Sequence, residues 1–312
     1  SSDACGIDTV YLSQYDFDCS AIGPNTVTLS VEDVNGNVSN CTATVTVEDT
    51  VSPMAMCQDI TVQLDANGEA SILTADIDNG SSDNCGIASL TLDQTDFTCA
   101  DVGVNTVTLT VTDVNGNTAT CSADVTVFDN IPPTALCQDV TIQLDASGNA
   151  SITTADIDDG SFDNCGIASL SLSQTDFDCN DLGANVVTLT VTDVNGNVSQ
   201  CTATVTVEDT ISPTALCNDL TVYLDDNGDA SITVADIDAG SFDNCTIVSS
   251  TLSVTDFDCS NVGPNTVILT VEDQSGNIGT CTSIVTVLDT TRPEIVCPPD
   301  LIANNAFGLC GN

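Results

Sequence analysis

The side chains in this chain that could do chemistry are mainly carboxylates, because it contains 46 Asp and Glu residues, one arginine, no lysine and no histidine. The absence of histidine excludes serine–histidine and cysteine–histidine nucleophiles and the zinc sites of His-Glu-x-x-His proteases. The absence of lysine excludes Schiff-base catalysis. Paired carboxylates could hydrolyse glycosides, but the same carboxylates recur along the chain, which favours a structural role. We therefore predict that the chain is not an enzyme.

Aspartate and asparagine residues recur with a spacing of 80 residues, in stretches that are expected to be loops. Calcium takes about six to eight oxygen ligands from carboxylates and carbonyls, so each group could hold a calcium ion where two repeats join. The candidate ligands are Asp49, Asp76, Asp78, Asp83, Asp113, Asn115, Asp129, Asp156, Asp158, Asp163, Asp193, Asn195, Asp209, Asp236, Asp238, Asp243 and Asp273. The alternative is that these residues only form turns, in which their side chains bond their own backbone. The Asp-x-Asp-Asn-Gly run that starts at Asp76 also misses the EF-hand spacing, since its glycine comes one position early.

Sixteen of the 17 cysteines follow the same spacing of 80 residues and form four columns. The columns are Cys5, Cys85, Cys165 and Cys245; Cys19, Cys99, Cys179 and Cys259; Cys41, Cys121, Cys201 and Cys281; and Cys57, Cys137, Cys217 and Cys297. A fixed period of this length predicts one folded unit copied in tandem. Regular cysteines in small units favour disulfides and an oxidising compartment over zinc, which needs closely spaced ligands. Four cysteines allow three connectivities, and spacing alone does not choose among them.

Residues 51–130 show the pattern of a β-unit. Apolar residues alternate with polar ones in 60–64 and in 106–112, and alternation with period two predicts half-buried strands. The turn signal at 65–68 predicts a return strand over 69–73, and Asn115-Gly116 predicts a second tight turn. Turns at short intervals are typical of a sandwich. We expect an all-β tandem array of sandwich domains of about 80 residues each, joined end to end as a rod with proline-stiffened linkers.

The repeat predicts five segments. Residues 1–50 are the C-terminal part of a repeat, 51–130, 131–210 and 211–290 are complete repeats, and 291–312 start a further one. Because both ends fall in mid-repeat, we expect a longer protein, with any targeting signal outside this stretch.

The net charge of −45 limits the partners of the chain. It excludes binding to the phosphate backbone of nucleic acids. There is also no apolar run long enough for a membrane span, so we predict no direct membrane insertion. The expected partners are neighbouring repeats of the same chain and like chains in a filament.

Several motifs together suggest a known family. Asp83-Asn84-Cys85-Gly86 and Thr112-Asp113-Val114-Asn115-Gly116-Asn117, followed by Cys121 and a proline-containing linker, resemble the hyalin repeat (HYR) family of extracellular immunoglobulin-like sandwiches. The chain also resembles the threonine-rich, lysine-poor repeats of giant surface adhesins of Bacteroidota, including gliding-motility adhesins. This resemblance covers the whole chain and implies an immunoglobulin-like fold and an extracellular, cell-surface location. Residues 3–6 and 243–246 depart from the Asp-Asn-Cys-Gly motif, and 291–312 is nearer to a standard hyalin repeat.

The resemblance to hyalin repeats also implies a disulfide pairing, with an outer pair in each repeat and an inner pair that involves the Asp-Asn-Cys cysteine. The implied outer pairs are Cys57–Cys121, Cys137–Cys201 and Cys217–Cys281. The implied inner pairs are Cys5–Cys19, Cys85–Cys99, Cys165–Cys179 and Cys245–Cys259, which leave Cys41, Cys297 and Cys310 without partners in the chain.

The likeness to Bacteroidota implies one modification. Asp-Thr-apolar and similar triplets resemble O-glycosylation sites of that group, with Thr9, Thr50, Thr210 and Thr290 as the acceptors. The alternative is that these are ordinary linker threonines.

The function that best fits these features is the structural shaft of an extracellular fibre or large cell-surface adhesin, which extends an adhesive tip from the cell. The alternatives are a calcium-dependent module that binds a glycan or a protein, and a spacer in a secreted multidomain hydrolase. Aromatic residues make up only 4% of the chain and tryptophan is absent, which disfavours sugar binding.

Overall fold

The computed structural model describes residues 1–297. Residues 298–312, Cys310 among them, lie outside the described residues. The chain divides into two compact units, one of residues 1–136, 160–171 and 190–200, the other of residues 137–159, 172–189 and 201 onward. The division passes through 131–210 and leaves 51–130 whole in the first unit and 211–290 whole in the second.

The same succession of elements recurs with the cysteine period. Residues 1–50 contain β1 (Ile7–Leu12), η1 (Cys19–Ala21), β2 (Gly23–Asp33) and β3 (Val38–Val47). Residues 51–130 contain β4 (Ile60–Gln63), β5 (Glu69–Ser71), α1 (Thr74–Ile77), β6 (Ile87–Leu92), β7 (Asp96–Thr98), η2 (Cys99–Asp101), β8 (Gly103–Asp113) and β9 (Thr118–Phe128). Residues 131–210 contain β10 (Val140–Gln143), β11 (Asn149–Ser151), α2 (Thr154–Ile157), β12 (Ile167–Leu172), β13 (Asp176–Asp178), η3 (Cys179–Asp181), β14 (Gly183–Asp193) and β15 (Val198–Glu208). Residues 211–290 contain β16 (Leu220–Tyr223), β17 (Ala230–Ser231), α3 (Val234–Ile237), β18 (Ile247–Leu252), β19 (Asp256–Phe257), η4 (Cys259–Asn261), β20 (Gly263–Asp273) and β21 (Ile278–Leu288).

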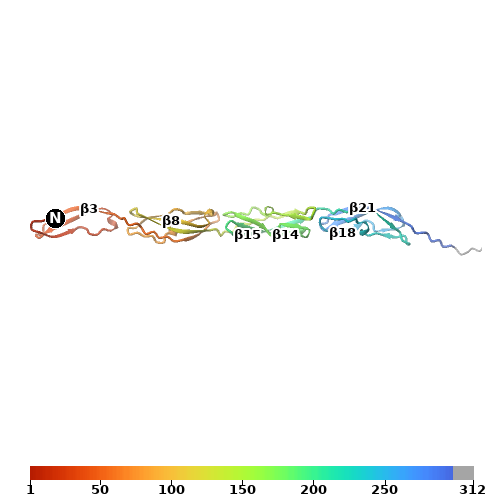
Figure 1. Cartoon of the computed structure of the whole chain (residues 1–312), viewed down its shortest axis with the longest axis horizontal. Helices are drawn as coiled ribbons and strands as arrows, with labels where there is room; N and C mark the ends of the chain where they lie inside the picture. The colour runs from red at the N-terminus through yellow and green to blue at the C-terminus, as the bar shows by residue number, and fades with distance from the viewer. Residues whose placement is uncertain (298–312) are drawn as a thin grey trace, which may run out of the picture. The chain divides into compact units, whose positions relative to one another are not determined.

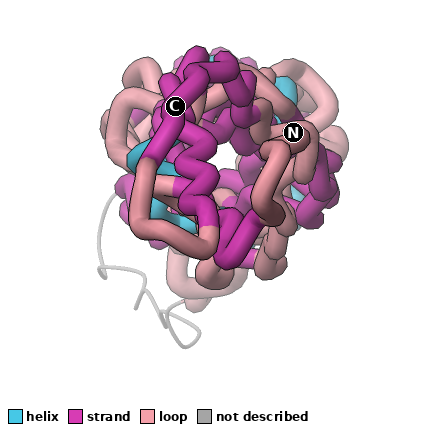
Figure 2. Tube along the Cα trace, turned by 90° about the vertical axis from the view of Figure 1, so that its left-hand side faces the viewer, coloured by secondary structure: helices cyan, strands magenta, loops and turns pink. Residues whose placement is uncertain are grey.

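Each whole repeat is a small sandwich of two sheets. In residues 51–130 the strand order of the larger sheet is β4-β9-β8-β6, and β5 pairs with β7 in the smaller one. β8 and β9 form a long antiparallel hairpin around Asn115-Gly116, whereas β4 runs parallel to β9. Residues 211–290 repeat this arrangement with β16-β21-β20-β18 and β17-β19. Strands dominate the trace and the helical segments are single turns (Figures 1 and 2). The expected all-β tandem fold is confirmed.

The core of residues 51–130 lies between the two sheets. Val107, Leu109 and Val111 on β8 are fully buried, and they pack in one cluster with Phe97 on β7 and Ile77 on α1. The residues between them on β8, Thr108 and Thr110, are half-buried on the other face, as alternation with period two requires. Fully burying one such apolar side chain stabilises the fold by about 1.5–3 kcal/mol. A core this small gives a limited total, which disulfides can supplement.

The strands predicted at 60–64 and 69–73 do not pair with each other. β4 joins the larger sheet and β5 the smaller one, so the turn between them carries the chain from one sheet to the other. Asp65 makes this turn, because its Oδ1 accepts the N–H groups of Asn67 and Glu69 at 2.8 and 3.0 Å. Leu64 and Ile72, on either side of the turn, are both buried in the core. The turn was predicted correctly and the pairing was not, since alternation does not say to which sheet a strand belongs.

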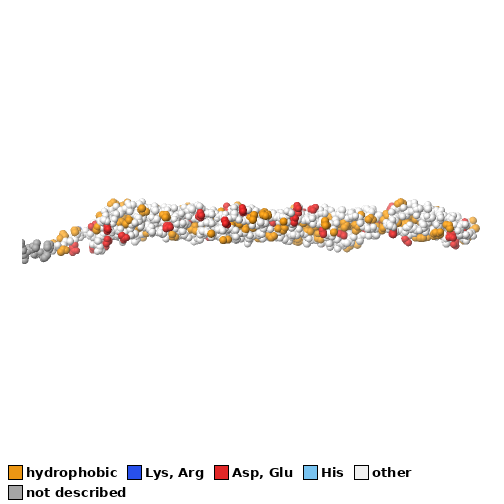
Figure 3. Space-filling view, turned by 180° about the vertical axis from the view of Figure 1, so that it is seen from behind, with side chains coloured by type: hydrophobic (Ala, Val, Ile, Leu, Met, Phe, Trp, Pro, Cys, Tyr) orange, Lys and Arg blue, Asp and Glu red, His pale blue; other side chains and the backbone are white. Residues whose placement is uncertain are grey.

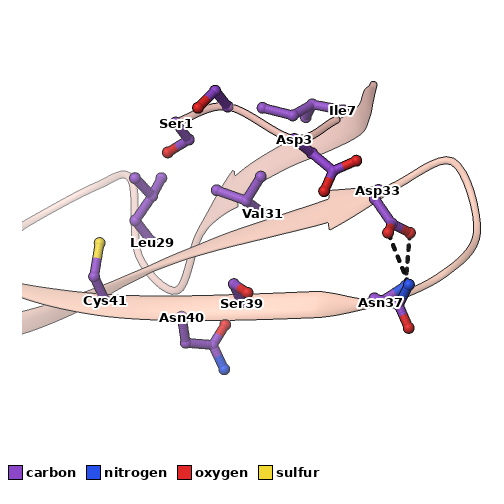
Figure 4. Close-up of a pocket in the computed structure, with 11 residues that line it drawn as sticks. Ser1, Asp3, Ile7, Leu29, Val31, Asp33, Asn37, Ser39, Asn40 and Cys41 are labelled. Carbon is purple, nitrogen blue, oxygen red and sulfur yellow. Dashed lines mark hydrogen bonds between the residues drawn. The ribbon is translucent and has the colours of Figure 1, made fainter. Parts of the chain in front are cut away.

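Residues 1–47 form a three-stranded sheet in the order β1-β2-β3. Leu29 and Val31 on β2 are half-buried there, whereas Leu109 and Val111 at the same places in residues 51–130 are fully buried. Leu29 and Val31 line a pocket together with Ile7 from β1 and the free Cys41 from β3 (Figure 4). The pocket therefore corresponds to the inner face that the second sheet covers in a whole repeat.

The face drawn in Figure 3 is mostly white, the colour of uncharged polar side chains and backbone, with orange hydrophobic side chains among them. The face in Figure 3 shows acidic side chains scattered singly or in small groups among white atoms. None of the helices among the described residues has the length and apolarity needed to cross a membrane.

Two phenylalanines in residues 211–290 test the position of the core. Phe257 is 3% exposed and lies in the core, whereas Phe242 is 59% exposed. We expect Phe257→Ala to cost about 3–5 kcal/mol, because it removes a buried ring and leaves a cavity. Phe242→Ala should cost less than about 0.5 kcal/mol, as surface changes do. Amide hydrogen exchange of peptides from β20 and β21, with each variant in the full chain, measures the difference. Equal exchange in the two variants would contradict this core.

Candidate cation site at the joints between repeats

Three groups of three aspartates come together where one repeat meets the next, and we call these places the joints. The groups are Asp49, Asp83 and Asp113 at the first joint, Asp129, Asp163 and Asp193 at the second, and Asp209, Asp243 and Asp273 at the third. In each group, one carboxylate oxygen from each residue lies within 4.8 Å of the others. The first two joints belong to the first compact unit and the third to the second.

The linker aspartate of each group presents one oxygen to the group. At the second joint Asp129 directly follows β9, the last strand of residues 51–130, and is 5% exposed. Its Oδ1 accepts the N–H of Ile131 at 3.1 Å and the side-chain Nδ2 of Asn164 at 3.2 Å, while its buried Oδ2 has no hydrogen-bond partner. Asp209 at the third joint repeats this arrangement with Ile211 and Asn244, and its Oδ2 is also without a partner.

The second aspartate comes from the Asp-Asn-Cys segment of the following repeat. The Oδ2 atom of Asp163 accepts the N–H groups of Cys165 and Gly166 at 2.8 and 3.1 Å. Its Oδ1 is buried and has no partner. The segment folds as an Asx turn, which holds the carboxylate in one orientation.

The third aspartate ends the long strand of the following repeat, as Asp193 ends β14. Its Oδ1 accepts the N–H groups of Asn195 and Asn197 at 2.9 and 2.8 Å, and its Oδ2 accepts Asn197 Nδ2 at 2.8 Å. The same Nδ2 donates to the backbone oxygen of Asp129 at 3.0 Å, so Asn197 ties the turn to the linker. The Oδ1 of Asn195 is buried without a partner.

At the first joint, hydrogen bonds favour the ionised form of Asp113. Burial acts to raise the pKa of Asp113, but the hydrogen bonds from Asn117 and from the backbone of Asn115 and Gly116 outweigh it. The pKa of Asp113 therefore lies below its ordinary value. Three carboxylates this close repel one another, and a cation is the natural partner that relieves the repulsion. The set contains only oxygen ligands, several of them buried without partners, which fits a hard cation such as calcium.

The structure brings together nine of the predicted ligands and places others elsewhere. Asp76, Asp156 and Asp236 accept the N–H groups of Leu73, Thr153 and Thr233 at the start of α1, α2 and α3, each at 2.7 Å. Asp78 and Asp238 accept the N–H groups of Ser81 and Ser241. Asp158, at the same place in its repeat, lies outside the group at the second joint. The hydrogen bonds of Asp76, Asp78, Asp156, Asp236 and Asp238 are those that the turn-forming alternative expects. Asn115 is exposed while Asn195 is half-buried, so the asparagine is best placed as a ligand at the second joint.

The sequence did not single out Asn117, Asn197 and Asn277 or Asn164 and Asn244 as site residues. These asparagines donate to the aspartates and to the neighbouring repeat rather than offering ligands. The signal was present in the recurring Asp-Asn-Cys and Asp-x-Asn-Gly-Asn motifs, in which a donor follows each aspartate at a fixed distance.

Each whole repeat contains one internal disulfide. The pairs are Cys57–Cys121, Cys137–Cys201 and Cys217–Cys281, with Cα–Cα distances of 5.8 Å. These are the outer pairs that the hyalin resemblance implies.

The implied inner pairs are wrong, because the structure joins successive repeats instead. Its bonds are Cys19–Cys85, Cys99–Cys165 and Cys179–Cys245, in place of Cys5–Cys19, Cys85–Cys99, Cys165–Cys179 and Cys245–Cys259. Cys85 precedes β6 and Cys99 follows β7, and a strand of six residues advances about 20 Å. A disulfide needs Cα atoms about 4.4–6.8 Å apart, and the inter-repeat pairs have 5.3–5.6 Å. Cys5, Cys41, Cys259 and Cys297 are free among the described cysteines.

Two of the inter-repeat disulfides, Cys99–Cys165 and Cys179–Cys245, lie against a glycine of the preceding repeat, Gly68 and Gly148. A Cβ atom on Gly148 would lie 2.6 Å from the backbone oxygen of Asn244 and 2.8 Å from Cys179 Sγ. Gly148 also has a φ of +75°, which L-residues other than glycine rarely adopt. The close approach of the turn, the disulfide and the Asp-Asn-Cys segment therefore requires glycine at this place.

The threonines predicted as glycosylation sites are all exposed. Thr210 also donates its hydroxyl to Gln143 Oε1 at 2.9 Å. Glycosylation of Thr9, Thr50, Thr210 and Thr290 stays a prediction.

Comparison with known proteins gives a clear likeness in sequence. No family model matches the chain. The chain is 30% identical to Hyalin of Strongylocentrotus purpuratus over 310 residues, which is 93% of this chain and 26% of that protein. It is 31% identical to Hyalin of Lytechinus variegatus over 216 residues, 64% of this chain and 40% of that protein. The chain thus spans about a quarter and two fifths of these relatives. It is an array of disulfide-linked β-repeats that is similar in sequence to sea-urchin hyalins.

The likeness to solved structures is weaker. Sidekick-1 immunoglobulin domains 1–5 match with a TM-score of 0.35 and 10% identity, covering 88% of this chain and 68% of that chain. Drosophila N-cadherin EC1-4 matches with a TM-score of 0.32 and 12% identity, covering 92% and 93%. Scores this low carry no conclusion about function.

The glycine at the disulfide allows a matched test of the joint. We expect Gly148→Ala to disturb the Cys179–Cys245 bond, because the new methyl group would meet Asn244 and Cys179. Gly160→Ala is the control, since Gly160 has a similar φ of +81° with nothing within 4 Å. Both variants bear the cost of a left-handed alanine, about 1–2 kcal/mol, and only Gly148→Ala should also lower the yield of the inter-repeat bond. Non-reducing peptide mapping measures that yield. Equal yields in the two variants would speak against the close approach.

The lowered pKa of Asp113 predicts a dependence of stability on pH. Because the folded pKa lies below the unfolded value of about 3.9, the stabilisation is complete above the unfolded pKa and is lost as the pH falls through the folded one. In chelator, we expect the urea midpoint of residues 51–130 to fall as the pH drops below about 4. In Asp113→Asn the midpoint should be lower at pH 7 and fall less steeply. A fall of the same steepness in both proteins would show that Asp113 is not responsible.

Proposed function

We propose that this chain is a structural, non-catalytic part of an extracellular array, such as the shaft of a fibre or of a large cell-surface adhesin, with calcium bound at its joints. The observation that carries the proposal is the joint itself, where an aspartate group and a covalent bond between successive repeats occur together. A joint built in this way resists separation of the repeats. An end-to-end arrangement of the repeats, and pairing of like chains in a filament, belong to this proposal.

An extracellular location is supported by the chemistry of the chain. Six disulfides persist only in an oxidising environment. The similarity to hyalins covers most of the chain and points in the same direction. The narrower likeness to gliding-motility adhesins of Bacteroidota gains no support, because the curated relatives reported above come from sea urchins. The proposal therefore stays at the level of an extracellular array.

The calcium part of the proposal assigns ligands to this chain's own residues. At the second joint Asp129 Oδ2, Asp163 Oδ1 and Asn195 Oδ1 are buried without partners, and a carboxylate oxygen of Asp193 lies in the same group. Water can complete the coordination of calcium. The bound ion would neutralise carboxylates from both repeats at once and so hold the joint closed.

One observation favours a binding module as the second candidate. Phe162 and Phe242 are each 59% exposed at the same place in successive repeats. An exposed ring that recurs could stack on a sugar or a partner side chain. A glycan-array screen of the full chain, with Phe162→Ala and Phe242→Ala together as the comparison, would support this function only if binding is found and then lost.

Calcium titration tests the main proposal. We expect three calcium ions per chain, with dissociation constants of about 0.1–1 mM, as in other extracellular modules. Asp129→Asn should weaken the second site more than about tenfold, because it removes a charged ligand oxygen. Asp156→Asn is the matched control, since Asp156 binds Thr153 at the start of α2 and should leave all three sites intact. Titration calorimetry measures both. Absence of calcium binding at several millimolar, or equal binding by the two variants, would contradict the site.

A further inference from the structure

We propose that the inter-repeat disulfide and the aspartate group at each joint are coupled, so that the disulfide presets the cation site and the bound cation protects the disulfide. This inference rests on the proposed function. It predicts that reduction of the joint weakens calcium binding there, and that calcium makes the same bond harder to reduce.

The coupling rests on the Asp-Asn-Cys segment, in which only one residue separates the ligand aspartate from the cysteine of the inter-repeat disulfide. At the second joint Cys165 donates its backbone N–H to Asp163 Oδ2 at 2.8 Å. This bond fixes the side chain so that Oδ1 is left for the aspartate group. A movement of Cys165 therefore moves the ligand with it.

The intervening asparagine connects the segment to the preceding repeat. Asn164 Nδ2 donates to the backbone oxygen of Asp65 at 3.2 Å and to Asp129 Oδ1 at 3.2 Å. The first contact lies at the turn of residues 65–68 beside the disulfide, and the second holds the linker aspartate. One side chain thus contacts both this turn of the preceding repeat and a proposed ligand of the site.

The disulfide Cys99–Cys165 holds the Asp-Asn-Cys segment on the preceding repeat. Cys99 Sγ lies 3.8 Å from the backbone oxygen of Gly68 and 3.5 Å from that of Asn164. Its bond to Cys165 therefore holds the Asp-Asn-Cys segment against the turn at 65–68. The third joint has the same set of contacts, with Cys179 and Cys245 in the bond and Asn244 Nδ2 on Asp145 O and Asp209 Oδ1.

The disulfide should strengthen cation binding, because it holds the segment that carries Asp163 in place before the cation binds. Without the bond, the segment that carries Asp163 is held to the preceding repeat by hydrogen bonds and by the linker alone. A cation must then order that segment as it binds, and the lost freedom lowers its affinity. Linkage makes the effect reciprocal, so calcium must disfavour reduction of the bond by the same factor.

The bond inside the repeat behaves differently and supplies the control. Cys137–Cys201 belongs to the repeat that contributes Asp163 and Asp193, and its sequence separation of 64 residues is close to the 66 of Cys99–Cys165. It crosses no joint and brings no ligand from one repeat to the next. Its reduction should leave the position of Asp163 relative to Asp129 unchanged.

The first experiment compares calcium binding by two double variants of the full chain. We expect Cys99→Ser with Cys165→Ser to lower calcium affinity at one site by about tenfold, within the range of ordinary coupling between sites, and to leave the other two sites unchanged. Cys137→Ser with Cys201→Ser should retain three sites of parental affinity. Unaltered affinity in the first variant would overturn the inference while the proposed function stands. If the parent chain binds no calcium, both fall.

The second experiment uses the unaltered chain and needs no variant to fold. A dithiol reductant passes two electrons and two protons to each disulfide, giving two thiols, and is itself oxidised to a cyclic disulfide. Alkylation and peptide mapping at equilibrium measure the reduced fraction of each bond, with calcium or with chelator. We expect calcium to shift reduction of Cys99–Cys165 and Cys179–Cys245 by about tenfold and to leave Cys137–Cys201 unmoved. An equal effect of calcium on all the bonds would show general stabilisation and sink the coupling.

Discussion

The chain must accommodate 46 acidic residues with a single basic one, and most of its polar structure follows from this constraint. Ion pairs cannot balance the carboxylates, so neutral donors do. Backbone N–H groups of turns take most of them, as at Asp65, where two such groups hold one oxygen. Asparagine side chains take others, and the pair of Asn117 with Asp113 recurs at each joint. Among the described residues, the carboxylate oxygens that are buried without a donor all belong to the aspartate groups at the joints, where a cation could contact several of them.

The second constraint is the small size of the repeat. One core of about ten buried residues serves each whole sandwich, so the internal disulfide adds to a limited hydrophobic stabilisation. The inter-repeat disulfide has a different role. It joins two successive repeats and fixes the segment that supplies a candidate ligand to the joint. The two kinds of disulfide therefore stabilise different levels of the structure, one the repeat and the other the array.

The sequence predicts the fold well because alternation reports directly on which side chains face the core. Val107, Leu109 and Val111 are buried as their spacing indicates, and Asn115-Gly116 makes the expected turn. The partners of Cys85 and Cys99 could not be predicted from such a local pattern. Cys85 and Cys99 are close in sequence, but β6 carries the chain from one end of the repeat to the other between them. The partner of each is a cysteine of another repeat, and only the three-dimensional meeting of two repeats identifies it. The same holds for the candidate ligands, since Asp76 and Asp83 are residues of the same type in one stretch of sequence. Only the start of α1 distinguishes the aspartate that bonds the helix terminus from the one in the group at the joint.

The third joint shows which parts of this arrangement are essential. Its segment reads Asn244-Cys245-Thr246, whereas the first two joints have glycine after the cysteine, with φ values of +108° and +106° at Gly86 and Gly166. Among the described residues only glycines have positive φ, so Thr246 takes another conformation. Asp243 nevertheless accepts the N–H of Cys245 at 2.9 Å, the disulfide to Cys179 forms, and the aspartate group at Asp209 and Asp273 is complete. The joint therefore depends on the cysteine, through its N–H and its sulfur, and the glycine beside it is dispensable. Cys245 both orients the carboxylate of Asp243 and bonds to the preceding repeat, and this double contact is the basis of the proposed coupling.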